Sequence, residues 1–463
     1  MADLLAPLRS GKQLRLRDQI ALILRLSLPA IMAQLSSIVM QYIDAAMVGR
    51  LGANDSASIG LVASSTWLFN GLCNAAVIGF SIQVAQQIGA DNRKEARSVV
   101  KQGFVAASAV ACLLCLIGAL ISPQLPIWLG GGEKIAEGAF RYFLVYALSL
   151  PVVQLNNISH AFLQASGNMK TPGMLYALMC GLDVVFNAFL IFPKLEIGVV
   201  RLPGADLGLT GAALGTALSQ VVIAVVMMFC LLVRSPALHL RKGEGFTLSK
   251  ICLTRGVRLA LPVAVEQCIT CGAYIMFTII VAPLGNIAIA ANSFAITAES
   301  LCYMPGYGIG SAATTIIGQS VGAARRDLTR KLGWLTTLLG MLIMIISGGL
   351  MYLAAPWMMA MLSPDVQVIA LGTQVLRIEA FAEGLYGASI VALGVFRGAG
   401  DTLLPSLMNF GSMWLVRLPL AAFLAPRYGL VGVWVAMALE LCVRGILFLI
   451  RLKGKKWEKY RQL

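Results

Sequence analysis

The sequence predicts an all-α polytopic membrane protein, with twelve transmembrane helices in two pseudo-symmetric six-helix lobes. Of its 463 residues, 58% are hydrophobic and only 12% are charged, whereas a soluble globular chain carries roughly 25% charged residues. An internal repeat supports the division into two lobes. Pro29, Gln34, Leu51, Gly52, Gln86, Gly89, Gly167 and Pro172 recur 233 positions later, as Pro262, Gln267, Leu284, Gly285, Gln319, Gly322, Gly400 and Pro405.

Apolar stretches long enough to cross a bilayer, about 20 residues each, follow one another along both copies. The first copy predicts helices at 19–43, 56–80, 103–122, 142–163, 172–193 and 208–233. The second copy predicts helices at 259–283, 287–312, 332–355, 367–393, 403–425 and 429–450. We therefore expect an N-lobe over 1–233, a linker over 234–258 and a C-lobe with a basic tail over 259–463. The first copy has extra residues at 193–208, for which we expect an outer loop, with a short hairpin as one form of it.

Lysine and arginine gather at one end of the predicted helices. They precede the first span, follow the even-numbered spans and fill the linker and the tail: Arg9, Lys12, Arg15, Arg17, Arg93, Lys94, Arg97, Lys101, Lys170, Arg234, Arg241, Lys242, Lys250, Arg255, Arg258, Arg325, Arg326, Arg330, Lys331, Arg397, Arg451, Lys453, Lys455, Lys456, Lys459 and Arg461. The other end keeps Arg50, Lys134, Arg141, Lys194, Arg201 and Arg427. By the positive-inside rule both termini and the linker are cytoplasmic, in the plasma (inner) membrane.

Several function classes are disfavoured by the same residues. The net charge of +15 lies in short loops at one membrane face, where topology explains it, so we expect contact with anionic lipid headgroups and no nucleic-acid partner. The pairs Cys112 and Cys115, and Cys268 and Cys271, lie inside apolar stretches, so we interpret them as small buried residues and not as a zinc or redox site. Because no nucleophile-and-base pair or HExxH pattern is present, we expect neither an enzyme nor a bound cofactor.

Acidic residues inside the spans are the default functional candidates. An ionised carboxylate in hydrocarbon costs several kcal/mol, so each must face the bundle interior, pair with a cation or be protonated. In the first copy, Asp44 stands where the repeat has Phe277, and Asp183 stands where it has Val416. Asn187 lies one helical turn after Asp183. Two carboxylates and an amide facing one pocket predict a site for Na⁺ or protons. The alternative is that Asp44 caps a helix end or meets water.

The second copy has its own set of acids. Glu266 replaces Ala33 of the first copy, and the other acids unique to this half are Glu299, Glu379 and Glu383. A cleft that combines these acids with Phe294, Tyr303, Tyr307 and Phe381 suits a bulky organic cation, through charge and cation–π contact. The alternative is that some acids neutralise intramembrane arginines such as Arg377, Arg417 or Arg444. For Glu440, one turn before Arg444, that alternative is favoured.

Several segments together resemble one known family. They are LPAIMAQLSSIVMQYIDAAMVGRLG and LPVAVEQCITCGAYIMFTIIVAPLG, VAQQIGA and IGQSVGA, LQASGNMKTP and FRGAGDTLLP, and the closing GLVGVWVAMALELCVRGILFLIRLKGKKW. In order and spacing they resemble the multidrug and toxic compound extrusion (MATE) transporters over essentially the whole chain. The resemblance implies two six-helix lobes and a cation-coupled antiporter that expels organic cations in exchange for Na⁺ or H⁺.

The resemblance also assigns residues. It implies that Asp44 is the family's acid in the first helix, that Asp183 and Asn187 are its polar pair in the fifth, and that Thr216 is the sixth-helix hydroxyl of the same ion site. Glu266 resembles an acid of the seventh helix. The family usually has Asn first and Asp four residues later, whereas this chain has Asp183 and then Asn187. The exchange moves the carboxylate by about 6 Å along the helix, which favours proton coupling over the usual Na⁺ geometry.

The expected function is therefore secondary active efflux of small organic cations, such as drugs and dyes, by alternating access. We expect a monomer in the lipid bilayer, with H⁺ or Na⁺ as the coupling ion. Two alternatives stay open. One is a lipid-linked oligosaccharide flippase of the same superfamily, whose cavity is typically lined by arginines and not by acids. The other is a membrane receptor or scaffold that transports nothing.

Overall fold

The computed structural model describes residues 4–9, 14–197, 200–239, 241, 244, 248–454 and 456–458. The chain divides into two compact units. Unit 1 comprises Met1–Leu35, Ala85–Asp91 and Val265–Leu463, and unit 2 comprises Ser36–Val84 and Asn92–Ala264. The helices α2 (Leu16–Gly49), α3 (Ala53–Gly89) and α9 (Lys250–Val281) each contribute residues to both units. The lobes expected at 1–233 and 259–463 stay a prediction.

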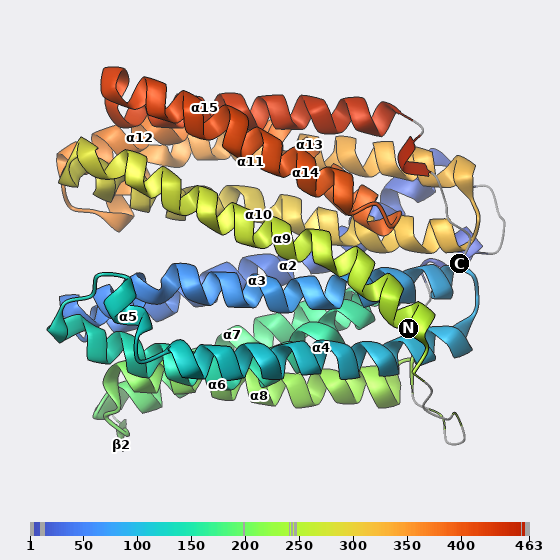
Figure 1. Cartoon of the computed structure of the whole chain (residues 1–463), viewed down its shortest axis with the longest axis horizontal. Coiled ribbons are helices and arrows are strands. Elements are labelled where there is room, and N and C mark those ends of the chain that lie inside the picture. Colours follow the sequence, from blue (N-terminus) through green and yellow to red (C-terminus); the bar gives the residue numbers. More distant parts are fainter. Residues whose placement is uncertain are drawn as a thin grey trace. The chain divides into compact units, whose positions relative to one another are not determined.

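Unit 2 holds the remaining helices of the first copy. They are α4 (Arg93–Ile121), α5 (Leu125–Trp128), α6 (Glu133–Ala165), α7 (Lys170–Ile191) and α8 (Gly208–Phe229), which continues into the π-helix η1 (Cys230–Arg234). Helix α8 packs against both α6 and α7 (Figure 1). Between α7 and α8, β1 (Lys194–Ile197) pairs antiparallel with β2 (Val200–Pro203), with Ile197 opposite Val200. The extra residues of the first copy thus form the short hairpin.

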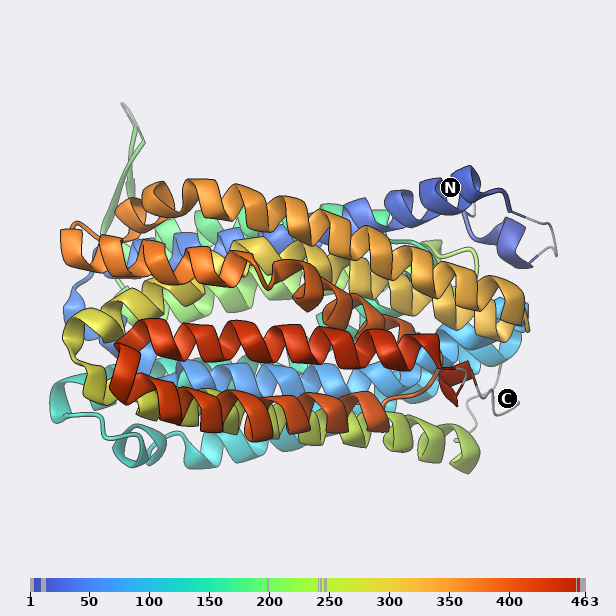
Figure 2. The ribbon, with the colours of Figure 1, turned by 90° about the horizontal axis from the view of Figure 1, so that it is seen from above.

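Unit 1 holds the second copy and the short α1 (Ala6–Arg9). After α9 and the 3₁₀ turn η2 (Ala282–Leu284) come α10 (Asn286–Gly322), α11 (Arg326–Leu362), α12 (Val366–Ala380), α13 (Glu383–Gly398), α14 (Leu403–Gly411), the π-helix η3 (Ser412–Arg417), α15 (Leu418–Lys453) and the 3₁₀ turn η4 (Lys456–Glu458). Figure 2 shows the red α15 folded back on itself. The fold lies at Gly429, whose φ of 60° and ψ of −143° suit glycine alone.

The count of membrane crossings agrees with the sequence. Within the described residues, ten helical runs are long and apolar enough to cross a membrane, and the bent pair α12 and α13 forms an eleventh. The run Leu403–Lys453 has 51 residues, which would measure about 76 Å if straight, more than twice the ~30 Å hydrocarbon core. Since this run folds at Gly429, it supplies two crossings. The all-α fold with twelve transmembrane helices is confirmed.

One predicted helix is divided. The sequence predicts a single helix at 367–393, but α12 and α13 meet at an angle of 59°. At the break, the N–H groups of Phe381 and Ala382 donate to carbonyls three residues earlier, at Ile378 and Glu379. This tighter turn re-aims the chain before the four-residue pattern resumes at Tyr386. The composition of the segment gives no sign of the bend, because no proline lies in it.

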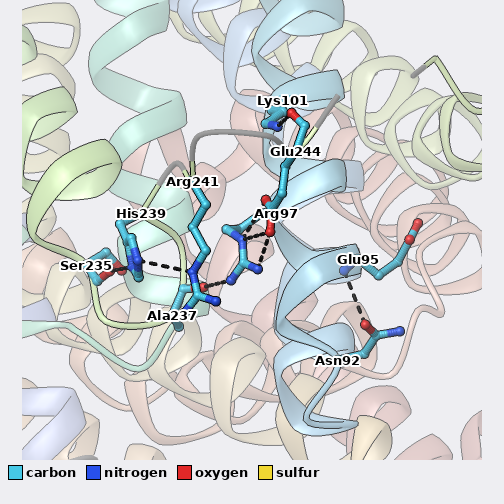
Figure 3. A network of polar contacts seen from close by, with 9 residues as sticks. All are labelled: Asn92, Glu95, Arg97, Lys101, Ser235, Ala237, His239, Arg241 and Glu244. Atoms are coloured by element: carbon cyan, nitrogen blue, oxygen red, sulfur yellow. Dashed lines mark hydrogen bonds and ion pairs between the residues drawn. The ribbon is translucent and has the colours of Figure 1, made fainter. Parts of the chain in front are cut away.

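Part of the linker lies against α4 (Figure 3). Arg97 Nε donates to Glu244 Oε2 over 2.9 Å, and Lys101 Nζ donates to the Glu244 backbone oxygen over 2.8 Å. Arg97 Nη1 also donates to the Ala237 carbonyl over 3.4 Å. The hydrogen bond from Arg97 holds the pKa of Glu244 below its usual value. The linker is thus tied to the beginning of α4 by one ion pair.

The membrane orientation stays a prediction. Among the basic residues expected at the cytoplasmic face, Lys12, Lys242, Lys455, Lys459 and Arg461 lie outside the described residues.

Candidate functional site

Three polar side chains of the first copy meet inside unit 2. Asp44 comes from α2, and Asp183 and Asn187 come from one face of α7. Asn187 Nδ2 donates to Asp44 Oδ1 over 2.7 Å and to Asp183 Oδ2 over 2.9 Å. Asp183 and Asn187 are fully buried, and Asp44 is partly exposed. One amide group therefore bridges the two carboxylates.

Glycine allows α8 to approach this cluster. A Cβ atom at Gly215 would lie 2.0 Å from Asn187 Oδ1, and one at Gly211 would lie 2.4 Å from the Leu190 carbonyl oxygen. Either contact is far inside van der Waals distance, so no larger residue fits without a shift. The GxxxG spacing of these two glycines is typical of closely packed membrane helices.

The hydroxyl at the cluster belongs to Ser219. Its Oγ donates to Asp183 Oδ1 over 3.3 Å and also contacts the Thr216 carbonyl oxygen at 2.8 Å. The resemblance implies this role for Thr216, whose backbone carbonyl oxygen contacts Ser219. Ser219 lies one helical turn after Gly215, the glycine that contacts Asn187. Helical spacing therefore places the Ser219 hydroxyl on the face of α8 that meets the cluster.

The cluster has more hydrogen-bond acceptors than donors. The Asn187 Oδ1 atom is buried and has no hydrogen-bond partner among the described residues. Two carboxylates and this oxygen together face one amide group and one hydroxyl group, an arrangement that attracts a proton or a small cation. Within the described residues, no group of three or more His, Cys, Asp or Glu side chains could hold a metal ion.

Glu266 is tied to neighbouring helices of unit 1. Its carboxylate accepts hydrogen bonds from Ser406 Oγ at 2.5 Å and Asn409 Nδ2 at 2.6 Å, both on α14. Arg397 Nη2, at the end of α13, lies 3.4 Å away. The sequence interpretation grouped Glu266 with the other acids of a substrate cavity. The structure gives it an arginine partner at the end of α13, which is not one of the intramembrane arginines named in the alternative interpretation, and it does not line the pocket described next.

A pocket in unit 1 combines charge with aromatic rings. Its lining residues are Tyr274, Phe277, Ile296, Glu299, Tyr303, Tyr386, Arg417, Met437 and Leu441. The ring centroid of Tyr303 lies 5.7 Å from that of Tyr386 and 5.8 Å from that of Tyr307. Of the predicted cavity residues, Glu299 and Tyr303 line this pocket, and Tyr307 adjoins it through Tyr303.

The remaining predicted cavity residues lie elsewhere in unit 1. Phe294 packs against the apolar core. Phe381 is 80% exposed at the bend between α12 and α13, with its ring centroid 5.7 Å from that of Tyr352. Glu379 and Glu383 are fully buried, and their carboxylate oxygens have no hydrogen-bond partner among the described residues. These two acids are therefore candidates for protonation, or for partners that come with a ligand.

Glu440 has the structural role that the sequence favoured for it. Its Oε2 lies 2.7 Å from Arg417 Nη2, and its Oε1 lies 3.0 Å from Arg444 Nε. The side chain of Glu440 is fully buried, and the side chains of the two arginines are nearly so. The charge of this acid is thus neutralised within the fold.

The MatE family model matches residues 29–189 and 262–423 of this chain. The chain belongs to the MatE family. The first residues of the two matched segments are Pro29 and Pro262, one pair of the internal repeat, so the family unit occurs once in each copy.

Relatives and solved structures are similar along almost the whole MatE chain. It is 26% identical to the probable multidrug resistance protein NorM of Thermotoga maritima, over 94% of this chain and 93% of the relative. It is 29% identical to the NorM protein of Pseudomonas aeruginosa, over 90% and 85% of the two chains. A crystal structure of MATE in complex with MaL6 matches with a TM-score of 0.88 at 19% identity, covering 99% of this chain and 100% of the other. The structural likeness establishes the fold.

Proposed function

We propose that this MatE protein is a secondary active multidrug efflux antiporter, which exports organic cations in exchange for H⁺ or Na⁺ by alternating access. The observation that carries the proposal is the bridge from Asn187 to Asp44 and Asp183. The group that joins these two acids is a neutral amide, and among the described residues neither acid has an ion pair. The names of the NorM relatives support multidrug efflux as the overall activity.

The coupling step follows from the cost of buried charge. With no ion bound, the charged carboxylates disfavour any state that removes them from water. A proton or Na⁺ entering between Asp44 and Asp183 neutralises them and removes their mutual repulsion. Since Asp44 lies on α2 and Asp183 on α7, ion binding changes how strongly these two helices attract each other. A ligand shifts a conformational equilibrium only by such a difference in affinity between states.

The residues around a small pocket in unit 1 are candidate partners for the organic cation. In this structure the pocket has room for little more than a water molecule, so it must widen to admit the cation. Glu299 supplies a carboxylate, and Tyr274, Tyr303 and Tyr386 supply ring faces in the same pocket. Such surroundings favour a flat cation with delocalised charge. Arg417 also lines the pocket, but its guanidinium group is held by Glu440 through Nε at 2.9 Å and Nη2 at 2.7 Å. This disfavours the flippase alternative, in which free arginines would receive a pyrophosphate.

The test is efflux of ethidium from proteoliposomes that contain the purified protein, with a pH gradient or a Na⁺ gradient imposed separately. We expect one of the two gradients to drive efflux and the other to have no effect, which identifies the ion. Liposomes without protein are the control for leakage. Efflux driven by neither gradient would contradict coupled antiport, and transport of a labelled pyrophosphate lipid in the same vesicles would support the flippase instead.

A further inference from the structure

A second set of polar side chains lies on α6 and contacts α7 and α8 near the carboxylate cluster. Asn156 Nδ2 donates to Gln220 Oε1 of α8 over 2.6 Å and lies 3.8 Å from Met179 Sδ of α7. His160 follows Asn156 by one turn, and its ring packs edge-on against Tyr176 of α7, with 4.7 Å between centroids. Polar side chains from three helices therefore meet in the interior of unit 2.

These residues continue the line of the carboxylate cluster. On α7, Met179 and Tyr176 precede Asp183 by one and two turns, so they share its face. On α8, Gln220 directly follows Ser219, whose hydroxyl donates to Asp183 over 3.3 Å. We call Asp183, Ser219, Gln220, Asn156, His160 and Tyr176 the polar seam. It leads from the cluster towards the connection between α6 and α7 at 166–169.

Atoms along the seam lack partners within the fold. Asn156 Oδ1 and His160 Nδ1 are buried and have no hydrogen-bond partner among the described residues. The same holds for two atoms outside the seam, Ser159 Oγ, next to His160 on α6, and Asn187 Oδ1, in the carboxylate cluster. Asn156 is 1% exposed and Ser159 is fully buried. An unsatisfied buried polar group destabilises the folded protein, because it has lost its hydrogen bonds to water. Several such groups on adjoining helix faces would strongly destabilise an interface that had only a structural role.

Water removes that cost where a site is polar and offers it two to four partners. The seam offers donors and acceptors one helical turn apart, which is the spacing a chain of waters needs. An intramembrane histidine beside amides and a carboxylate is also an arrangement found in proton relays of membrane proteins. The structural alternative, a dry polar contact between helices, leaves the unpartnered atoms of Asn156 and His160 unexplained.

We infer that the polar seam is a hydrated path along which the coupling cation leaves the Asp44 and Asp183 site towards the α6–α7 connection. This rests on the proposed antiport, and it adds the route and the residues that form it. Asn156 and His160 act as positioning residues, which hold the water chain and do not bind the organic cation. With the orientation expected from the positive-inside rule, this route ends at the cytoplasmic face.

The first test measures hydration and is independent of transport. Hydroxyl radicals formed by X-ray radiolysis label buried side chains that have water beside them. We expect Met179, which is 1% exposed, to be oxidised several-fold faster than Met227 of α8, which is fully buried in the same unit. In an Asn156→Leu variant the rate at Met179 should fall to that of Met227. Equal, slow oxidation of both methionines in the wild-type protein would overturn the inference.

The second test measures ion-driven efflux in the same proteoliposomes. Asn156→Leu and His160→Phe should each lower the maximal rate roughly tenfold, a barrier increase of about 1.4 kcal/mol, while the ethidium concentration at half-maximal rate is unchanged. Asn74→Leu is the matched control, because Asn74 is exposed and bonded to Asn70 on α3. Wild-type rates in both seam variants would sink the inference while leaving the antiport intact. Absent wild-type efflux would sink the antiport, and Met179 labelling would still decide whether the seam is wet.

Discussion

Acids inside the helices have different partners in two regions of the molecule. In unit 1, Glu440 lies between Arg417 and Arg444 at 2.7 and 3.0 Å. In unit 2, Asp44 and Asp183 share one amide group from Asn187. The first acid has its counter-charge in the fold, and the second pair must obtain it from outside. The comparison separates charges that hold the structure from charges that are available for ion exchange.

The largest effect on stability should come from removing the negative charge of Glu440 between its two arginines. Glu440→Gln leaves two buried guanidinium groups without their carboxylate, and removing one partner of a buried ion pair costs about 3–5 kcal/mol. We expect a strong loss of folded protein and a clearly lower thermal unfolding temperature in detergent. Asp44→Asn is the comparison variant and should unfold at nearly the wild-type temperature. Equal unfolding temperatures for the two variants would remove the distinction between the regions.

A smaller effect is expected where α8 packs against the cluster of Asp44, Asp183 and Asn187. Gly215→Ala places a methyl group 2.0 Å from Asn187 Oδ1, and overpacking of this kind costs about 1–3 kcal/mol. We expect displacement of Asn187 and reduced ion-driven efflux. Gly181→Ala is the matched control, since a Cβ there would meet nothing within 4 Å. Should both variants behave alike, the close approach of α8 to Asn187 has no role in efflux.

A further comparison separates Ser219 from Thr216. Ser219→Ala removes one hydrogen bond of 3.3 Å to Asp183, and a typical hydrogen bond contributes about 0.5–1.5 kcal/mol. The concentration of coupling ion needed for half-maximal efflux should therefore change several-fold. Thr216→Val keeps the backbone carbonyl that Ser219 contacts and should change it little. The reverse order of effects would favour the role that the family resemblance gives to Thr216.

The smallest effect concerns the linker. A hydrogen bond from Arg97 holds the pKa of Glu244 below its usual value of 4.5. The contact therefore contributes its full stability above pH 4.5. This stability is lost as the pH falls through the lowered pKa of Glu244. Limited proteolysis of residues 235–249 should accelerate at acidic pH in the wild-type protein. In Arg97→Gln the rate should already be high at neutral pH. A rate that is independent of both changes would show that the ion pair does not hold the linker.

Composition and the repeat predict most of the fold. The sequence itself reveals the apolar spans through hydrophobicity and the basic connections through charge. Comparison of the two copies reveals the extra residues at 193–208. The break before Gly429 can also be predicted, since separate helices are expected at 403–425 and 429–450. The bend at Phe381 is harder to foresee, because it depends on how neighbouring helices pack. Several predicted helices are shorter than those observed, such as 56–80 against α3 and 287–312 against α10. Hydropathy marks the hydrocarbon crossing, and these two helices continue beyond it.

The candidate site is predictable in part. Asp183 and Asn187 lie one turn apart, so their common face is readable from spacing alone, and Asp44 stands out because its repeat partner is Phe277. The partners of Glu266 and Glu440 are not readable in this way, because Ser406, Asn409 and Arg417 lie far away in the sequence. Residue type likewise grouped Phe381 with the cavity, whereas it lies exposed at a bend.

The central claim is that Asp44 and Asp183, which share one neutral amide, carry the coupling ion. The most direct measurement is gradient-driven ethidium efflux by the isosteric variants Asp44→Asn and Asp183→Asn, normalised to the amount of folded protein in the vesicles. The account predicts that both variants are folded, bind ethidium and show no gradient-driven efflux. Wild-type efflux by either variant would contradict it.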